Sequence, residues 1–426
     1  MLTSLAACIV IPLLLVAWNA GGRLRRSPWP AVAVFLWYGA GLTRVAVGNV
    51  RVPREWDYAC FWLYGHIAAA HRNIYDPAVY GGFAVPFKLD ADFRQAVLAV
   101  GFPYPPPTAA LFFPLGFIHS VPLGLALWYL VQFAALAGAA WVLARVFLRA
   151  DGPPAALLVL AILVALPASL MNVGDAQTNF LVLLLCALAL AGRETRAGAV
   201  WEGLALWVKP YAVALLLFDA AGRRWGRLVA AGGTIVLSLV ISLLVVGPQA
   251  FATYVRANPS GREPAFAFVE VVNQSLLAIA LRLHGTLPTH VAALHEPLYV
   301  AGALLLTVLT VGLCARSTAA SEVRFAATLL LGLIVYPGTL SSYGVILIIP
   351  LLLLWQHRAV FWGGTAGVAV VTGAAVLLQS GALQLGFEAN VLMWLACAYL
   401  LVTQRDLDAG RRRTRGSAPA REAVHS

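Results

Sequence analysis

One carboxylate in the sequence has a setting suited to acid–base chemistry. Asp57 precedes a predicted aromatic helix over residues 61–72, among tryptophans and tyrosines typical of a membrane–water interface. A carboxylate held there can act as a general base toward the hydroxyl group of a substrate. It can equally cap the N-terminus of the helix by accepting hydrogen bonds from its free N–H groups. The residue types leave both interpretations open.

Cationic and polar residues interrupt apolar sequence in several other places. Lys209 stands before a proline inside an apolar segment, and a buried lysine is tolerated mainly beside a cavity or a partner charge. Arg256 and Arg282 can bind a phosphate through paired hydrogen bonds, or extend toward lipid headgroups. Arg256 and Arg282 are therefore candidates for binding a phosphate. The candidates for contacting other parts of a substrate are Tyr104, Gln177, Asn179, Asn273, Gln274 and Tyr343.

The sequence predicts no cofactor. Asp90 and Asp92 form an Asp-x-Asp pair of the kind that can bind a metal, but such a triplet arises easily by chance in a polar loop. We therefore expect no metal site, with this pair as the weaker alternative. The five cysteines show no spacing with histidine that would predict zinc.

The elements that must position these residues are membrane helices. Hydrophobic residues make up 61% of the 426 residues and charged residues only 11%, whereas soluble domains are about 25% charged. This composition excludes a cytosolic enzyme, a disordered chain and a secreted disulfide-rich scaffold. It predicts an all-α polytopic membrane protein with about eleven spans of roughly 20 residues each. The predicted spans cover residues 2–20, 29–48, 120–147, 154–172, 178–192, 226–247, 293–315, 325–341, 343–357, 359–379 and 387–404.

The segment 198–219 is the exception among the apolar runs. It lies between arginine clusters at 193–196 and 223–227, and Lys209 followed by proline interrupts its middle. Because proline breaks the helical hydrogen-bond ladder, we predict a re-entrant hairpin with Lys209 near its tip. A single crossing is the alternative, and it would invert the orientation of every later span.

The distribution of cations predicts the orientation of the chain. With the hairpin, most arginines fall in clusters on one side, which identifies that side as cytoplasmic. Residues 1–404 then form one membrane domain, with long extracytoplasmic loops at 49–104 and 248–292 and a basic, disordered cytoplasmic tail at 405–426. Loops of such length commonly carry function. The net charge of +11 is spread over short clusters, so we expect contact with membrane lipids and no nucleic-acid partner.

The order of several short motifs resembles glycosyltransferase family 87. An outer-loop aspartate comes first, followed by a Tyr-Asp-Pro turn, a Tyr-Pro-Pro start of an apolar run, a Gln-x-Asn turn and a Gly-Leu…Lys-Pro segment. The resemblance covers roughly residues 29–360. In this chain the motifs are Asp57, Tyr75-Asp76-Pro77, Tyr104-Pro105-Pro106, Gln177 with Asn179, and Gly203-Leu204 with Lys209-Pro210.

The resemblance implies a GT-C fold and an inverting glycosyl transfer on the extracytoplasmic face of a bacterial-type plasma membrane. The donor would be a polyprenyl-phosphate-linked hexose, with mannose suggested by the family, and the acceptor a glycolipid or glycan. Asp57 would be the general base, and Lys209, Arg256 or Arg282 would neutralise the charge of the donor phosphate. Some members carry a histidine at the outer end of a late span, but residues 336–343 contain none, which leaves the acceptor open.

Two other classes of protein fit the apolar sequence. A transporter or lipid flippase usually has paired broken helices around a site at the middle of the membrane. This chain has one evident broken segment, at Lys209, and its polar residues gather at the outer face instead. The third class is a non-catalytic assembly or anchoring subunit, which would not need Asp57.

Overall fold

The computed structural model describes residues 2–19, 27–53, 56–76, 78–79, 83, 104–148, 152–257, 273–284, 295–317, 319–380, 383 and 385–416. Within these residues the regular structure is helical, apart from an isolated β-bridge between Asn273 and Leu340. Among them, five helices are long and apolar enough to cross a membrane, or six if a bent pair counts as one span. The predicted all-α membrane protein is confirmed, whereas the eleven spans and the GT-C fold stay predictions.

The chain folds into one helical bundle. Several apolar helices are shorter than a full span: α11 has 13 residues and is therefore about 20 Å long. The first half comprises α1 (Leu2–Asn19), α3 (Trp29–Arg51), α4 (Trp56–Ala69), α7 (Pro106–Ala110), η1 (Phe113–Phe117), α8 (Val121–Leu143), η2 (Ala144–Leu148), α9 (Pro153–Ala165), α10 (Pro167–Gly174), α11 (Asn179–Ala191) and α12 (Arg196–Val208). The second half comprises η3 (Pro210–Ala214), α13 (Leu215–Ala221), α14 (Trp225–Ala257), α16 (Leu276–His284), α18 (His295–Arg316), α19 (Ser321–Val335), η5 (Ser341–Leu347), α20 (Ile348–Gln356), α21 (Gly364–Leu378) and α22 (Gly386–Gly416).

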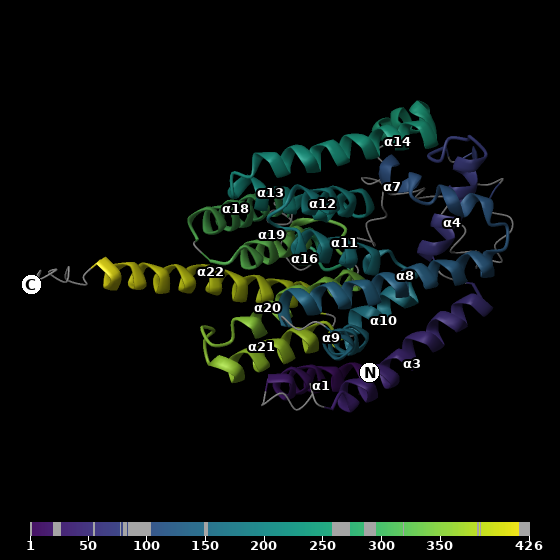
Figure 1. The fold of residues 1–426 in the computed structure, drawn as a ribbon. Helices are drawn as coiled ribbons and strands as arrows, with labels where there is room; N and C mark the ends of the chain where they lie inside the picture. The colour runs from purple at the N-terminus through teal and green to yellow at the C-terminus, as the bar shows by residue number, and fades with distance from the viewer. Residues whose placement is uncertain are drawn as a thin grey trace, which may run out of the picture.

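The bundle has an apolar interior and an apolar exterior. Figure 1 shows α14 along one side and α1 with α3 along the opposite side, with α11, α19 and α20 between them. Leu183 of α11 and Leu329 of α19 are completely buried. On the outside, Trp37 of α3, Leu244 of α14 and Val308 of α18 are 70%, 79% and 68% exposed. Such a surface is accommodated by lipid, because the hydrocarbon core of a bilayer is as apolar as these side chains.

Different helices and loops lie at the two ends of the bundle. We call the end that carries α4 and α7, on the right in Figure 1, the outer end, after the loops that the sequence predicts to be extracytoplasmic. At the opposite, inner end, α14 begins beside the loop between α11 and α12. Both long segments that the sequence assigns to extracytoplasmic loops contain helices: α4 in the first, and α16 with the last turns of α14 in the second. α14 bends at Gly247, whose φ of 79° lies in the left-handed region, before continuing to Ala257.

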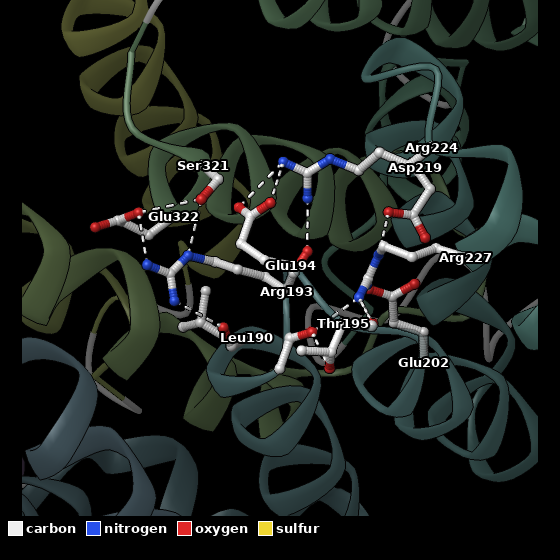
Figure 2. A network of polar contacts seen from close by, with 11 residues as sticks. Leu190, Arg193, Glu194, Thr195, Glu202, Asp219, Arg224, Arg227, Ser321 and Glu322 are labelled. Atoms are coloured by element: carbon white, nitrogen blue, oxygen red, sulfur yellow. Dashed lines mark hydrogen bonds and ion pairs between the residues drawn. The ribbon is translucent and has the colours of Figure 1, made fainter.

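The segment after α11 doubles back on itself. α12 leads to Lys209, whose backbone is extended, and η3 and α13 then return. Both ends of this hairpin meet at the guanidinium of Arg227: it contacts Glu202 and the carbonyl of Thr195 near the start, and Asp219 near the end, at 2.7 Å (Figure 2). The segment therefore enters and leaves at the inner end, which favours the hairpin over a single crossing. Because α12 has 13 residues, Lys209 lies about 20 Å from that end.

Further ion pairs hold the inner end of the hairpin to its neighbours. Arg224 binds the Arg193 carbonyl at 2.6 Å and the Glu194 carboxylate at 3.1 Å (Figure 2). Arg193 in turn pairs with Glu322 of α19 at 3.2 Å. The two arginine clusters that bracket this segment in the sequence are thus brought together in space, interleaved with carboxylates.

Helix α22 continues into the basic tail as far as Gly416. The predicted cytoplasmic tail over residues 405–426 stays a prediction. A helix that is already nucleated in the membrane domain extends readily through good helix formers, and Leu407, Ala409 and Arg411 are of this type. Residues 417–426 lie outside the described part of the chain.

Candidate active site

Helix α4 is buried inside the outer end of the bundle. We expected a helix at the membrane–water interface, but the side chains of Tyr58, Trp62 and Tyr64 are packed inside the protein and at most 4% exposed. A Cβ on Gly65 would lie 2.3 Å from the carbonyl oxygen of Phe112, so α4 packs directly against the backbone that leads into η1. The helix is apolar all round, which favours burial over an amphipathic surface position. This packing holds the start of α4, and with it Asp57, in a fixed place.

Asp57 lies in the first turn of α4 and is half-buried. Its Oδ2 accepts a hydrogen bond from Nε2 of Gln177 at 2.5 Å, and within the described residues no hydrogen bond reaches its Oδ1. Burial raises the pKa of the Asp57 carboxyl above its ordinary value, although the Lys209 ammonium and the hydrogen bond from Gln177 each act to lower it. A carboxylate with a raised pKa and an oxygen without a partner is suited to accepting a proton.

The amide of Gln177 joins Asp57 to Lys209. Its Oε1 accepts a hydrogen bond of 3.0 Å from Nζ of Lys209, while its Nε2 donates to Asp57. Gln177 is completely buried in the turn between α10 and α11, where its N–H donates to the carbonyl of Asn172 at 2.9 Å. Pro167 interrupts the helical hydrogen bonds between α9 and α10, which meet at a bend of 70°. This bend directs the turn that carries Gln177 into the bundle.

Lys209 is completely buried, and oxygen atoms surround its ammonium group. Besides Gln177, it donates to the hydroxyl groups of Tyr104 at 2.9 Å and Tyr343 at 2.8 Å. Nζ also lies 4.8 Å and 4.5 Å from the centroids of these two rings, within the range of cation–π attraction. The structure thus brings Asp57, Tyr104, Gln177, Lys209 and Tyr343 into one connected group, which we call the outer cluster. Lys209 is thus surrounded by protein acceptors, and its role as a phosphate ligand stays a prediction.

Tyr104 is positioned by the helix that follows it. Thr108 of α7 donates to the carbonyl of Trp207 at 2.9 Å, and the indole of Trp207 donates back to α7, so that α7 docks on the end of α12 just before Lys209. The hydroxyl of Tyr75 donates to the Tyr104 carbonyl at 2.8 Å. The Tyr-Asp-Pro turn and the Tyr-Pro-Pro start, distant motifs in the sequence, therefore touch each other.

Arg256 lies at the outer end as an exposed residue. The last turns of α14 reach the same region as Tyr104: the ring of Tyr254 lies 5.2 Å from that of Tyr75, and Thr253 accepts a hydrogen bond of 2.8 Å from Asn73. The guanidinium of Arg256 is therefore available to a ligand that approaches the outer end.

The remaining predicted residues hold the segment that leads into Tyr343. Asn273 forms the β-bridge to this segment, and the N–H of Gln274 donates to the carbonyl of Thr339 at 2.6 Å. Arg282 donates to the Asn273 carbonyl at 3.1 Å. Asn179 donates to the hydroxyl of Ser342 at 3.2 Å. Four predicted residues are therefore linked to the outer cluster through the segment that ends at Tyr343, namely Asn179, Asn273, Gln274 and Arg282.

Sequence reasoning missed Tyr211. It is buried, and its ring lies 5.3 Å from that of Tyr343. Tyr211 also lines an apolar cavity of about 350 Å³ together with Tyr299, Leu331 and Tyr336. Its position two residues after Lys209, directly behind the proline, was the available signal.

A metal site is not assembled among the described residues. Within them, no group of three or more His, Cys, Asp or Glu side chains lies close enough together to hold a metal ion. Asp90 and Asp92 lie outside the described residues, so this pair stays an untested alternative.

Comparison with known proteins identifies the family of this chain. The family model of glycosyltransferase family 87 matches residues 102–342, which is more than half of the chain. The matched range contains Tyr104, Gln177 and Lys209 but begins after Asp57. Searches of curated proteins and of solved structures found no match. Because the family match spans the hairpin and most of the outer cluster, this chain belongs to glycosyltransferase family 87 and is a membrane glycosyltransferase.

Proposed function

We propose that this protein transfers a hexose, with mannose as the first candidate, from a polyprenyl-phosphate-linked donor to a glycolipid or glycan acceptor. The transfer takes place on the extracytoplasmic face of a bacterial-type plasma membrane and inverts the anomeric carbon. Asp57 is the general base. The observation that carries the proposal is the geometry of Asp57, which Gln177 orients through one oxygen while the other remains open to an acceptor hydroxyl.

The reaction proceeds in one displacement. The acceptor hydroxyl gives its proton to Oδ1 of Asp57, and its oxygen forms the new bond to the anomeric carbon. The bond between that carbon and the phosphate oxygen breaks, and its electron pair leaves with polyprenyl phosphate. Attack from the face opposite the leaving group inverts the configuration, through a transition state with oxocarbenium character.

The outer end of the bundle offers suitable surroundings for a lipid-linked donor. The exposed guanidinium of Arg256 can bind the phosphate, and Arg282 is the second candidate. The cavity beside Tyr211 is apolar, as a prenyl chain requires, and Tyr211 contacts Tyr343 of the outer cluster. A donor carried by lipid also explains why a helical membrane bundle suffices, since no nucleotide has to be bound.

Family membership favours this function over the two alternatives. A transporter or an anchoring subunit has no need of an oriented carboxylate with an unoccupied oxygen, whereas a glycosyltransferase needs a base for the acceptor hydroxyl.

The Asp57→Asn variant tests the proposal. We expect it to reduce transfer of radiolabelled mannose from polyprenyl-phosphate-mannose, in membranes of the native cells, by about 10²- to 10⁴-fold. Asparagine has nearly the same shape but cannot take up the proton, so the variant should be produced and extracted in the same amount as the wild type.

Asp76→Asn is the matched control. Asp76 accepts a hydrogen bond from the N–H of Ala78 within an outer turn, and asparagine retains that acceptor oxygen, so transfer should stay unchanged. Wild-type transfer by Asp57→Asn would remove Asp57 from the mechanism. Failure of the wild-type protein with polyprenyl-phosphate-mannose, -glucose and -arabinose alike would contradict the proposed donor class.

A further inference from the structure

The ammonium group of Lys209 has its three protons directed at protein acceptors. They point to the hydroxyl groups of Tyr104 and Tyr343 and to Oε1 of Gln177, at 2.8–3.0 Å. The side chain is completely buried. A phosphate could bind Lys209 only by displacing one of these partners, which makes a role as direct phosphate ligand unfavourable.

The hydrogen bond from Lys209 fixes the orientation of the Gln177 amide. An amide side chain has one acceptor and one donor end, and an ammonium group can only donate. Because Oε1 must face Lys209, Nε2 is turned toward Asp57, where it donates to Oδ2. Oδ1 is then the oxygen that remains for the substrate. The turn between α10 and α11 buries the amide completely, which limits other orientations.

We propose that Lys209 is a positioning residue, which acts on Asp57 through the amide of Gln177 and through its charge. This inference rests on the proposed role of Asp57 as the base. Lys209 orients the carboxylate so that Oδ1 faces the acceptor, and its positive charge stabilises the ionised form that accepts the proton. It touches neither the sugar nor the phosphate.

Among the described residues, few other titratable groups face Asp57. On α4 itself, Cys60 is close enough to be affected by the carboxylate, and both its burial and Asp57 raise the pKa of its thiol. Tyr104 and Tyr343 contact Lys209, and α14 brings Arg256 to the outer end. The other elements packed on α4, namely η1, α7 and α8, contain no charged residue. They offer no charge that could replace that of Lys209.

The predicted pH dependence has a definite sign. Asp57 accepts a proton only when ionised, so the rate falls as the pH falls through its pKa. Lys209 acts to lower that pKa. Removing the ammonium group therefore moves the acid limb of the rate profile to higher pH. A lysine that bound only the donor phosphate would instead raise the KM of the donor and leave this limb in place.

The experiment measures kcat, the KM of the donor and the pH profile for purified wild-type protein and for Lys209→Met, Lys209→Arg and Gln177→Met. The substrate is the polyprenyl-phosphate sugar that the wild type uses. We expect Lys209→Met and Gln177→Met to lower kcat by about ten- to a hundredfold, as small displacements of a catalytic group do, with donor KM changed by less than about twofold. Both should shift the acid limb to higher pH, the lysine variant more. Lys209→Arg retains the charge and should keep the acid limb near its wild-type position.

Each outcome distinguishes this inference from the proposed function. An active Asp57→Asn variant would refute the base itself. An inactive Asp57→Asn variant, together with a Lys209→Met variant that changes donor KM alone, would overturn the positioning role and make Lys209 a phosphate ligand. Wild-type kinetics in Gln177→Met would overturn the route through the amide. If Lys209→Met fails to fold, Lys209→Arg and Gln177→Met still decide the question.

Discussion

The two ends of one hairpin hold their charges in opposite ways. At the inner end, Arg227 contacts the carboxylates of Glu202 and Asp219 directly, and all three side chains are at most 5% exposed. At the outer end, the ammonium of Lys209 and the carboxylate of Asp57 are separated by the amide of Gln177. Both ends are polar islands in an apolar bundle, but only one of them keeps its opposite charges apart.

This difference shows how a charge can be used for structure or for chemistry. A buried guanidinium bonded to carboxylates holds the chain together, and its charge is compensated on the spot. A carboxylate that is bonded to an uncharged amide keeps its second oxygen available to a substrate. It also remains a better proton acceptor than a carboxylate paired directly with a cation. We therefore expect substitutions of the ion-paired residues at the inner end to affect mainly stability, and substitutions within the outer cluster to affect mainly turnover.

Arg227→Met should give the largest change in stability. It leaves two buried carboxylates without their cation, and breaking a buried ion pair in this way costs about 3–5 kcal/mol. The measurement is thermal unfolding of the detergent-solubilised protein, followed by transfer per folded molecule. The control is Arg223→Met, an exposed arginine just before α14, which should unfold like the wild type. A loss of turnover in folded Arg227→Met protein as large as that expected of Lys209→Met would contradict the view that the inner end serves stability and the outer end serves turnover.

Gly65→Ala should have an intermediate effect, on the outer end. The added Cβ would lie 2.3 Å from the Phe112 carbonyl oxygen, so α4 must shift, at a cost of roughly 1–3 kcal/mol. Since α4 carries Asp57, kcat should fall together with stability. Gly41→Ala is the control, because a Cβ there meets nothing within 4 Å. Full turnover in Gly65→Ala would show that the position of Asp57 does not depend on this contact.

Glu194→Gln should have the smallest effect. Its side chain is 61% exposed, and solvent screens its ion pair with Arg224, so the loss of stability should stay under about 1 kcal/mol. Thermal unfolding of this variant and of Arg227→Met, measured side by side, compares the stability lost with an exposed ion pair and with a buried one. A loss as large as that of Arg227→Met would contradict the view that burial sets the importance of the inner ion pairs.

Several features of the site were accessible from sequence because they are local. A proline interrupts a helix whatever the surrounding fold, so the break after Lys209 could be predicted. The arginine clusters on both sides of the segment indicated a hairpin. Asp57 was named as a candidate because it precedes an aromatic helix, and Gln177 because it is polar between two apolar runs. The burial of α4 was not foreseen, because aromatic residues suit a membrane interface and a protein interior equally well.

The sequence by itself determined that this protein is a helical membrane protein. It also showed where the apolar runs are interrupted and which polar residues interrupt them. Only the tertiary structure decided how those residues combine. Asp57 and Gln177 are 120 residues apart, and Lys209 and Tyr343 are 134 residues apart. Hydrogen bonds act over about 3 Å, so their pairing depends on how distant helices pack and not on any local pattern. The orientation of the Gln177 amide, and with it the open oxygen of Asp57, follows from that packing.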